Sequence, residues 1–470
     1  MRERTYSNDP AQYHRTADGM SIPAHRLGYA TGMTDVPGIE FAVATTIRDQ
    51  LYDRIEMSAE ELALLNTHPL QRLERIQQLG FASRVWPGAR HTRFEHSLGV
   101  LFLARKALHH LRTRYGDAVV PLDSTRTIAA AALLHDVGHY PFSHAIEELG
   151  DPVRPHEVVG RDLITSDPIA CVLREQWGVD PDRVAAVIDP HGYELKPSDR
   201  MLRALLSGPL DVDKMDYLPR DARACGVPYG GVDTERLISS LEIHEVDGEP
   251  RVTVGEKGIS PTHSLINARQ EMFDNVYWHH TNRACMVMLL RAVQEGLIAR
   301  TISADDVTGL DDAGLLALLS EPRMPEPTRR LCQALIERRI HKRAIEVSAR
   351  AGQLHRQLGA LYADPARRRI VEERLDAAVA TIVGIPVPHG AILIDIPKPE
   401  KWRTDVLVSF RRPPIGFEPV MAWREVAGLA DADLKRYEEH RRMIRIVTVA
   451  ELRAVVRELW ESILPAALAG

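Results

Sequence analysis

The sequence predicts a mainly α-helical protein whose C-terminal part is a small mixed α+β lobe. Apolar residues recur at helical spacing through most of residues 58–299. Runs of β-branched residues are confined to one hairpin after residue 240 and to short segments after residue 390. The chain has 470 residues, more than one ordinary domain, so we expect a core with an appended lobe.

Three parts are expected along the chain. Residues 1–38 are polar and lack helical periodicity, which predicts a flexible or partner-dependent arm. Residues 39–300 form the predicted helical core. Beyond residue 300, Arg-rich helical segments alternate with β-branched runs. We therefore expect residues 301–470 to form the α+β lobe, with a role in oligomerisation or regulation.

The core is expected to begin with two helices over residues 58–79, broken near Pro69. Ser58 and Glu61 form a capping-box pattern at the start of the first helix. A loop then leads to a helix over residues 94–115. Further helices are expected over 127–150, 156–165, 168–177, 181–188, 199–207, 211–220 and 234–241, and a long one over 261–299.

Strand signals are fewer. The segments LEIHEV and RVTVG flank Asp247 and Gly248, a dipeptide typical of tight hairpin turns. In the lobe, the runs ILIDI, DVLVSF and RIVTV predict a small sheet. Helices are expected beside it over 312–320, 326–338, 365–383 and 449–462.

Composition narrows the class of protein. Hydrophobic residues make up 44% of the chain and charged residues 26%, as in soluble globular proteins. The net charge of -6 argues against a general nucleic-acid coat, so nucleic-acid binding is not predicted. No apolar stretch approaches the roughly 20 residues that cross a bilayer, and the N-terminus has no apolar signal core. The four cysteines form no CxxC pair, which fits a reducing cytoplasm.

The chemistry centres on residues 131–147, AALLHDVGHYPFSHAIE. His135 and Asp136 stand side by side, and histidine recurs at His139 and His144. An imidazole next to a carboxylate suits a divalent cation. His139, one helical turn after His135, projects from the same face.

Two other segments supply further ligands. His96 lies in HTRFEHSLGV, three residues after Arg93 and on the same helical face. Asp213 lies in DVDKMDYLPRD, with Tyr217 one turn later and Asp221 two turns later. Together with His135 and Asp136, these residues predict a site of two histidines and two carboxylates.

Six segments in the same order resemble the HD-domain phosphohydrolases. The resemblance is closest to the deoxynucleoside triphosphate (dNTP) triphosphohydrolases, the family of the metazoan sterile-alpha-motif and HD-domain enzyme and its bacterial relatives. The segments are QRLERIQQLG, PGARHTRFEHSLGV, LLHDVGHYPFSH, HE at His156, DVDKMDYLPRD and RQEMFDNVYWHH. The resemblance runs from about residue 40 to residue 301 and continues more thinly into the lobe. The resemblance implies an HD-domain helical core and hydrolysis of dNTPs to deoxynucleoside and inorganic tripolyphosphate.

The resemblance also implies roles for individual residues. The metal ligands would be His96, His135, Asp136 and Asp213. The phosphate contacts would be Arg93, His139, His156, Lys214, Tyr217 and Arg269. Gln78, Leu79 and Asp221 would contact the deoxyribose, and Tyr277 would pack where a ribose 2′-hydroxyl must fit. His144 would act beside the scissile bond with Glu147, which stands where the family has Asp.

These roles suit the reaction. Attack on the α-phosphorus needs an activated water and neutralisation of triphosphate charge, which Arg93, Lys214 and Arg269 can supply. The departing 5′ oxygen needs a proton, and His144 is the expected donor. A neutral core role for His144, or for Tyr277 as a core aromatic, stays open.

Regulation is suggested by three further positions. Gln71, Arg338 and Lys342 resemble the contacts of an activating nucleotide that links family members into dimers or tetramers. Asn66 and Glu74 depart from the family, and a carboxylate at Glu74 should repel phosphate. A solvated basic helix face is the alternative for Arg338 and Lys342.

Two other function classes remain at this stage. One keeps the HD fold but changes the substrate, as a phosphodiesterase or nuclease. The other is a nucleotide-sensing oligomer with vestigial chemistry. For the metal, a set of histidine and carboxylate ligands accepts Fe, Mn, Zn, Ni or Mg.

Overall fold

The computed structural model describes residues 36–398, 405–429, 432 and 441–469. The arm predicted over residues 1–38 therefore lies outside the described residues except for its last three. The mainly helical fold class is confirmed, with sheets of two, four and three strands among the described residues. The predicted domain boundary near residue 300 stays a prediction, because the chain from Asp35 onward clusters as one compact unit.

A hairpin that the sequence analysis missed opens the core. Strands β1 (Val43–Asp49) and β2 (Asp53–Ser58) pair antiparallel. The two predicted helices follow as α1 (Ala59–Leu65) and α2 (His68–Arg72). The capping box of α1 is confirmed, because the Ser58 hydroxyl accepts from the Glu61 amide while the Glu61 carboxylate accepts from the Ser58 amide.

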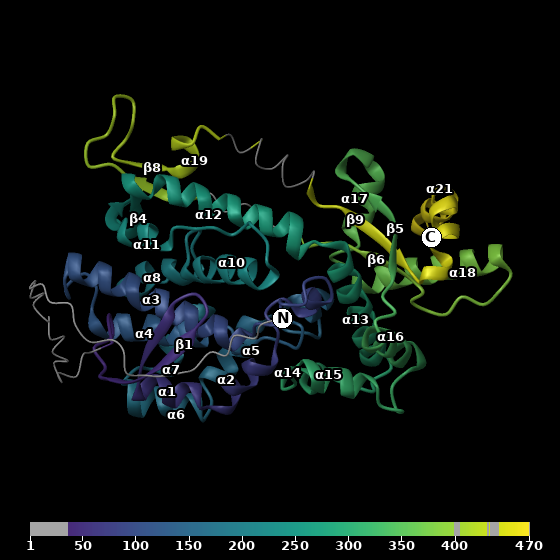
Figure 1. The fold of residues 1–470 in the computed structure, drawn as a ribbon, viewed down its shortest axis with the longest axis horizontal. Helices are drawn as coiled ribbons and strands as arrows, with labels where there is room; N and C mark the ends of the chain where they lie inside the picture. Colours follow the sequence, from purple (N-terminus) through teal and green to yellow (C-terminus); the bar gives the residue numbers. More distant parts are fainter. Residues whose placement is uncertain (1–35, 399–404, 430–431, 433–440, 470) are drawn as a thin grey trace, which may run out of the picture. The chain divides into compact units, whose positions relative to one another are not determined.

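The central helices of the core are α3 (Arg93–Tyr115), α4 (Leu122–Leu134) and α10 (Val212–Cys225). Helix α3 packs against both α4 and α10, and Figure 1 shows the three close together. The shorter helices are α5 (His156–Ile164), α6 (Ile169–Val172), α7 (Pro181–Ile188), α8 (Pro197–Leu202), α9 (Ala204–Ser207) and α11 (Thr234–Ser239). Single helical turns lie at η1 (Leu73–Arg75), η2 (Gly80–Arg84) and η4 (Leu173–Trp177).

The helix predicted over residues 127–150 is wrong beyond Leu134. Helix α4 ends there, and the chain turns before the 3-10 segment η3 (Ser143–Leu149). The turn brings Gly138 against α5, where a Cβ at this position would lie 2.1 Å from the carbonyl oxygen of His156. His139 is therefore not on the same helical face as His135. The two histidines are brought together by a turn.

The helix predicted over residues 261–299 is also interrupted. Helix α12 (Ile259–Met272) runs into a π-helical turn, η6 (Phe273–Tyr277), and helix α13 (His280–Ile298) starts afresh. The side chain of His279 caps α13 by accepting from the Thr281 amide. The predicted hairpin is confirmed as β3 (Leu241–Val246) and β4 (Glu249–Gly255).

The C-terminal part contains helices and short strands in alternation. The helices are α14 (Ala304–Thr308), α15 (Asp312–Leu319), α16 (Glu326–Ile336), α17 (Gln353–Ala360), α18 (Pro365–Val383), α19 (Trp423–Val426) and α21 (Arg453–Ala469). The strands are β5 (Lys342–Val347), β6 (Ile392–Asp395), β7 (Leu407–Ser409), β8 (Val420–Ala422) and β9 (Ile444–Thr448). None of the described helices is long and apolar enough to span a bilayer.

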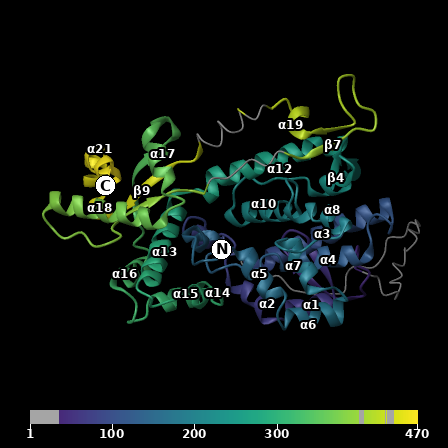
Figure 2. The same ribbon diagram turned by 180° about the vertical axis from the view of Figure 1, so that it is seen from behind.

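The three predicted β-branched runs do not form one sheet. β6 and β9 pair in a sheet of order β5-β9-β6, and α18 and α21 pack against it (Figure 2). β7 instead joins the core hairpin, where Val408 pairs in parallel with Val254 of β4. Val408 is fully buried in this sheet. The sequence of a single strand does not reveal which sheet the strand joins.

Gly99 lies on α3 where that helix meets α10. An added Cβ would lie 1.9 Å from Asp216 Oδ1 and 2.5 Å from Arg220 Nη2. We expect Gly99→Ala to lower the free energy of unfolding in urea by about 1–3 kcal/mol, because both buried side chains must move. Gly309→Ala is the control, since its Cβ meets nothing within 4 Å. Equal stability of the two variants would contradict the close approach of α3 and α10.

The Asp376 carboxyl gives the fold a pH dependence. Burial raises its pKa to about 8, although its oxygens accept from the Gly390 and Ile392 amides. Because the folded state holds this proton more strongly than the unfolded state, stability falls as pH rises through 8. Between pH 6.5 and 8.5, wild type should lose about 2 kcal/mol more of unfolding free energy than Asp376→Asn. Parallel urea titrations of both proteins check this, and identical pH profiles would refute it.

Candidate metal centre and active site

Three of the predicted metal ligands lie together where α3, α4 and α10 meet. His96 comes from α3, His135 follows the last residue of α4, and Asp213 comes from the first turn of α10. One ligand atom of each lies within 4.8 Å of the others. Asp213 Oδ1 is 3.0 Å from His96 Nε2 and 3.8 Å from His135 Nε2. Three distant segments thus meet at one point.

Asp136, the fourth predicted ligand, lies beside this group. Its Oδ1 is 3.3 Å from His135 Nε2 and its Oδ2 is 3.8 Å from His96 Nε2. The Arg93 guanidinium donates to Oδ2 at 2.6 Å. Arg93 is itself buried, so it orients this carboxylate as well as carrying charge toward the site.

The donor set fits a divalent cation. His135 Nδ1 donates to the Ala132 carbonyl, which leaves Nε2 as an acceptor that is buried and unpartnered in the described part of the chain. His96 Nδ1 donates to Asp216, so His96 Nε2 likewise faces the group. Two imidazole nitrogens and two carboxylates suit a borderline divalent ion.

The electrostatics of the group favour positive charge. Burial lowers the pKa of His96, but hydrogen bonds with Asp213 and Asp216 outweigh burial and raise that pKa to about 10. Burial raises the pKa of Asp136, but Arg93 and the neighbouring histidines hold it well below its usual range. A pocket that stabilises a proton this strongly between His96 and its carboxylates can also stabilise a cation.

Asp216 is a functional residue that the sequence analysis missed. Its fully buried carboxylate accepts four hydrogen bonds. The donors are His96 Nδ1 at 2.8 Å, the Tyr52 hydroxyl at 2.8 Å and two nitrogens of Arg220 at 2.9 Å. Arg220 also binds Asp49, so the missed hairpin β1–β2 supports the metal group. The spacing of the residues could have indicated its role, because Asp216 follows the predicted ligand Asp213 by three positions on the same helix.

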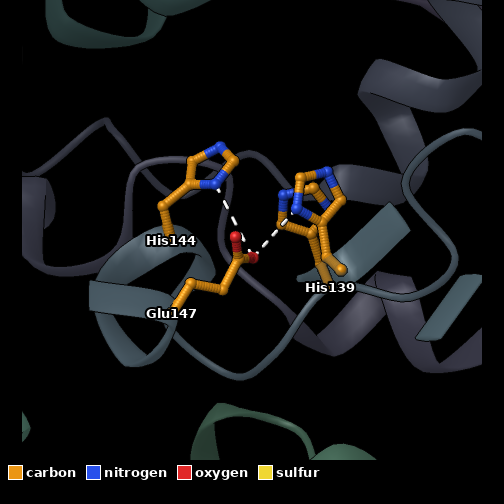
Figure 3. A group of neighbouring side chains, drawn as sticks. His139, His144 and Glu147 are labelled. Carbon is orange, nitrogen blue, oxygen red and sulfur yellow. Dashed lines mark hydrogen bonds and ion pairs between the residues drawn. The ribbon is translucent and has the colours of Figure 1, made fainter. Parts of the chain in front are cut away.

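A second cluster lies directly beside the first. It consists of His139, His144, Glu147 and His156, whose candidate ligand atoms lie within 4.8 Å of one another. Figure 3 shows the Glu147 carboxylate between His144 and His139. Glu147 Oε1 is 2.9 Å from His156 Nδ1 and 3.8 Å from His144 Nδ1, while His139 Nδ1 is 3.1 Å from Asp136 Oδ1. Asp136 therefore touches both clusters.

The members of this cluster differ in environment. The His144 side chain is 57% exposed, which excludes the core role left open for it. Burial, reinforced by Arg93, lowers the pKa of His139 far below its usual value, so this ring is neutral. Burial opposes ionisation of Glu147, but hydrogen bonds to His144 and His156 lower its pKa, and the same carboxylate raises the pKa of His156.

The turn that presents His144 is strained. Phe142 and Ser143, neither of them glycine, have φ of 57° and 63°. Such left-handed residues cost about 1–2 kcal/mol each and persist only when their surroundings fix them. The Phe142 amide donates to Asp312 at 2.7 Å, its ring stacks on Phe81, and Arg93 donates to the Ser143 hydroxyl. Asp312 belongs to the C-terminal part, so a segment distant in sequence helps to fix the position of the turn before His144.

The predicted phosphate contacts surround the metal group. Lys214 and Tyr217 follow Asp213 on α10, and the Tyr217 ring lies 6.4 Å from that of His96. Lys214 Nζ is bound to Asp211 at 2.5 Å. Arg269 on α12 lies over the Phe273 ring and acts electrostatically on the Tyr217 hydroxyl, whose pKa burial raises.

Two of the predicted sugar contacts, Tyr277 and Asp221, meet. The Tyr277 hydroxyl donates to Asp221 Oδ2 at 2.7 Å, and the Tyr277 ring lies 6.3 Å from that of Tyr217. Leu79 packs against the main hydrophobic core. Gln78 Oε1 is buried and has no partner among the described residues.

The three predicted activator contacts do not share a helix. Gln71 lies in α2, where its side-chain amide nitrogen Nε2 donates to the Leu65 carbonyl. Arg338 follows the end of α16 with φ of 60° and binds the Arg84 carbonyl, while Lys342 starts strand β5. The basic-helix-face alternative is therefore wrong, because the helix ends at Ile336.

Comparisons with known proteins agree with this geometry. The HD domain model matches residues 93–221, and the model of the HD associated region matches residues 232–413. An uncharacterized protein of Methanocaldococcus jannaschii is 33% identical over 273 residues, covering 58% of this chain and 54% of that protein. The human deoxynucleoside triphosphate triphosphohydrolase SAMHD1 is 28% identical over 296 residues, covering 57% of this chain and 46% of that protein.

A solved structure extends the likeness. A hypothetical protein from Aquifex aeolicus matches with a TM-score of 0.66 and 25% identity, covering 88% of this chain and 99% of that one. The chain spans about half the length of the curated relatives it matches. It carries an HD domain followed by an HD associated region. The similarity to SAMHD1 supports the resemblance to the HD-domain dNTP triphosphohydrolases that its motifs implied.

Asp216→Asn tests the support of the metal group. The amide replaces one acceptor oxygen by an NH2 donor, which would face either His96 and Arg220 Nε or the Tyr52 hydroxyl and Arg220 Nη2, and it removes the negative charge beside His96. His96 therefore loses its fixed orientation. We expect affinity for a divalent cation to fall about 10–100-fold, measured by calorimetric titration of the protein stripped of metal. Asp189→Asn is the matched control, since it removes the carboxylate 2.7 Å from His191 Nδ1. A similar loss in both variants would contradict the role of Asp216.

Proposed function

We propose that this protein is a metal-dependent dNTP triphosphohydrolase that releases deoxynucleoside and inorganic tripolyphosphate. One observation carries the proposal. The Asp136 carboxylate joins a group suited to a cation, His96, His135 and Asp213, to a cluster suited to proton transfer, His139, His144, Glu147 and His156. Phosphoester hydrolysis needs these two functions side by side.

The cation site is assigned to His96, His135, Asp136 and Asp213. A divalent ion held there would supply Lewis acidity for activating a water nucleophile near neutral pH. Lys214 and Arg269 bring positive charge to the triphosphate, and the Tyr217 ring lies beside that of His96. Neutral His139 and the neighbouring His156, whose ring centroids lie 3.8 Å apart, offer hydrogen bonds to phosphate oxygens.

Proton delivery is assigned to His144. Its exposed ring can reach a substrate that enters from solvent, and Glu147 Oε1 lies 3.8 Å from its Nδ1. Because the Glu147 carboxylate lies on the Nδ1 side of the ring, it leaves the Nε2 edge free for the substrate. The longer Glu side chain is shared with His156, so it positions two histidines at once.

Selection of deoxyribose is assigned to Tyr277, with Gln78, Leu79 and Asp221 around the sugar. The Tyr277 ring is held through its hydroxyl by Asp221, which fixes it in place. A fixed ring against C2′ excludes a ribose hydroxyl sterically, which a pocket cannot achieve by hydrogen bonding to a missing group.

Activation by a nucleotide is a further part of the proposal. We assign Gln71, Arg338 and Lys342 to a regulatory site between subunits of a homo-oligomer, a dimer or a tetramer. In support, Arg338 and Lys342 lie close in the chain, between the end of α16 and the start of β5. The free cysteines suit the cytoplasmic location that we propose.

Product analysis tests the function. Purified protein is metal-analysed for Fe, Mn, Zn, Ni and Mg, then incubated with each dNTP and NTP, alone and in pairs. Tripolyphosphate and deoxynucleoside should appear in equal amounts, and Asp136→Ala should abolish both. The proposal fails if all four dNTPs stay intact under every pairing. Cleavage of single-stranded nucleic acid that Asp136→Ala abolishes would indicate a nuclease instead.

The role of His144 has its own test. We expect His144→Gln to lower kcat about 10²–10⁴-fold with little change in KM, because it removes the proton donor but no substrate contact. His389→Gln is a close control, since His389 is 60% exposed and its Nδ1 lies 4.0 Å from Glu373. If kcat is retained in His144→Gln, another group delivers the proton.

A further inference from the structure

We propose that His91 is a positioning residue that sets the selectivity for deoxyribose by holding Asp221 and, through it, Tyr277. This inference rests on the proposed function and adds to it a residue outside the motif contacts assigned so far. His91 stands in the loop before α3 and touches none of the proposed metal ligands in the described structure.

Three buried side chains form a chain of hydrogen bonds. His91 Nε2 lies 2.7 Å from Asp221 Oδ1, and the Tyr277 hydroxyl lies 2.7 Å from Asp221 Oδ2. The side chains of His91 and Asp221 are 4% and 2% exposed. Because an ionised carboxylate only accepts, His91 and Tyr277 are both donors, one to each oxygen. The carboxylate is therefore fixed from two sides.

The backbone of His91 holds the other sugar contact. Its carbonyl accepts from the Gln78 amide at 3.0 Å, and Gln77 and Thr92 form an isolated antiparallel bridge. The side chain of His91 thus fixes Asp221 while its backbone fixes Gln78. Two residues assigned to the deoxyribose, distant in sequence, are joined through one histidine.

Two polar atoms near this hydrogen-bond chain make no hydrogen bond within the described residues. His91 Nδ1 and Gln78 Oε1 are both buried and unpartnered in the part of the chain that the structure describes. A buried polar atom without a hydrogen bond is unfavourable, and hydroxyl groups of a bound sugar can supply the missing donors. An orphan atom alone does not define a site, but here one belongs to the histidine that holds Asp221 and the other to Gln78, whose backbone amide donates to that histidine's carbonyl.

Removal of His91 should act on selectivity. Asp221 would keep one donor and gain freedom to rotate, so the Tyr277 ring would lose its fixed position against C2′. Binding of deoxyribose should weaken and exclusion of ribose should relax. The proton donor His144 and the metal group should be untouched, because neither contacts His91.

The test uses two substitutions at His91 and one control. His91→Phe fills the volume but donates no hydrogen bond, whereas His91→Gln retains an amide donor near the position of Nε2. His341→Phe is the control, because His341 is also buried, has Nε2 bonded to the Gly390 carbonyl and has Nδ1 unpartnered. Binding of the α,β-imido triphosphates of deoxyadenosine, adenosine, deoxyguanosine and guanosine is measured, together with kcat and KM for the natural nucleotides.

We expect His91→Phe to lower the ratio of deoxyribonucleotide to ribonucleotide affinity at least tenfold and to raise KM for dNTPs by about tenfold, with kcat within about threefold. His91→Gln and His341→Phe should stay within about threefold of wild type in that ratio. An unchanged ratio in His91→Phe, or an equal loss in His91→Gln or His341→Phe, overturns the inference. Wild-type protein that hydrolyses no dNTP refutes the proposed function separately, and the affinity ratios then still decide the role of His91.

Discussion

The buried carboxylate of Asp216 is the interaction on which the candidate site depends most. It orients His96, receives Arg220 and the Tyr52 hydroxyl, and so joins α3, α10 and the β1–β2 hairpin at one point. Such a carboxylate is costly to bury, and removing a partner from a buried charged group typically costs about 3–5 kcal/mol. The absence of a side chain at Gly99 makes the room for it. Stability and metal geometry are therefore linked through the same contact.

The sequence predicted the helical core well because its helices carry strong periodicity and clear end signals. The capping box at Ser58 and the turn at Asp247 and Gly248 are local patterns, and both are confirmed. The helix predicted over 127–150 was wrong because apolar periodicity continues through a turn in which Gly138 lies against the His156 carbonyl. That contact is made across the fold, so no local pattern announces it.

The candidate site shows the same division. The four proposed ligands and the His139 cluster were predicted because their motifs place recognisable chemistry at fixed spacings. Asp216, His91 and Asp312 were missed, because each acts through a partner more than 100 positions away in the sequence. Asp312 is the clearest case, since it holds the strained turn before His144 from the C-terminal part. Residues that touch a substrate are easier to find from sequence than residues that hold those residues in place.

The pairing of β7 with β4 bears on how the chain reaches this structure. Ser409 donates to Glu242, which lies 167 positions earlier in the sequence. The four-stranded sheet therefore cannot form until the ribosome has synthesised the chain beyond Ser409. Contacts of such long sequence separation form slowly, and an unpaired edge of β4 is open to misassembly in the meantime. During synthesis on the ribosome, the helices of the HD domain can fold early, but the flank of the hairpin beside them must wait for the late arrival of β7.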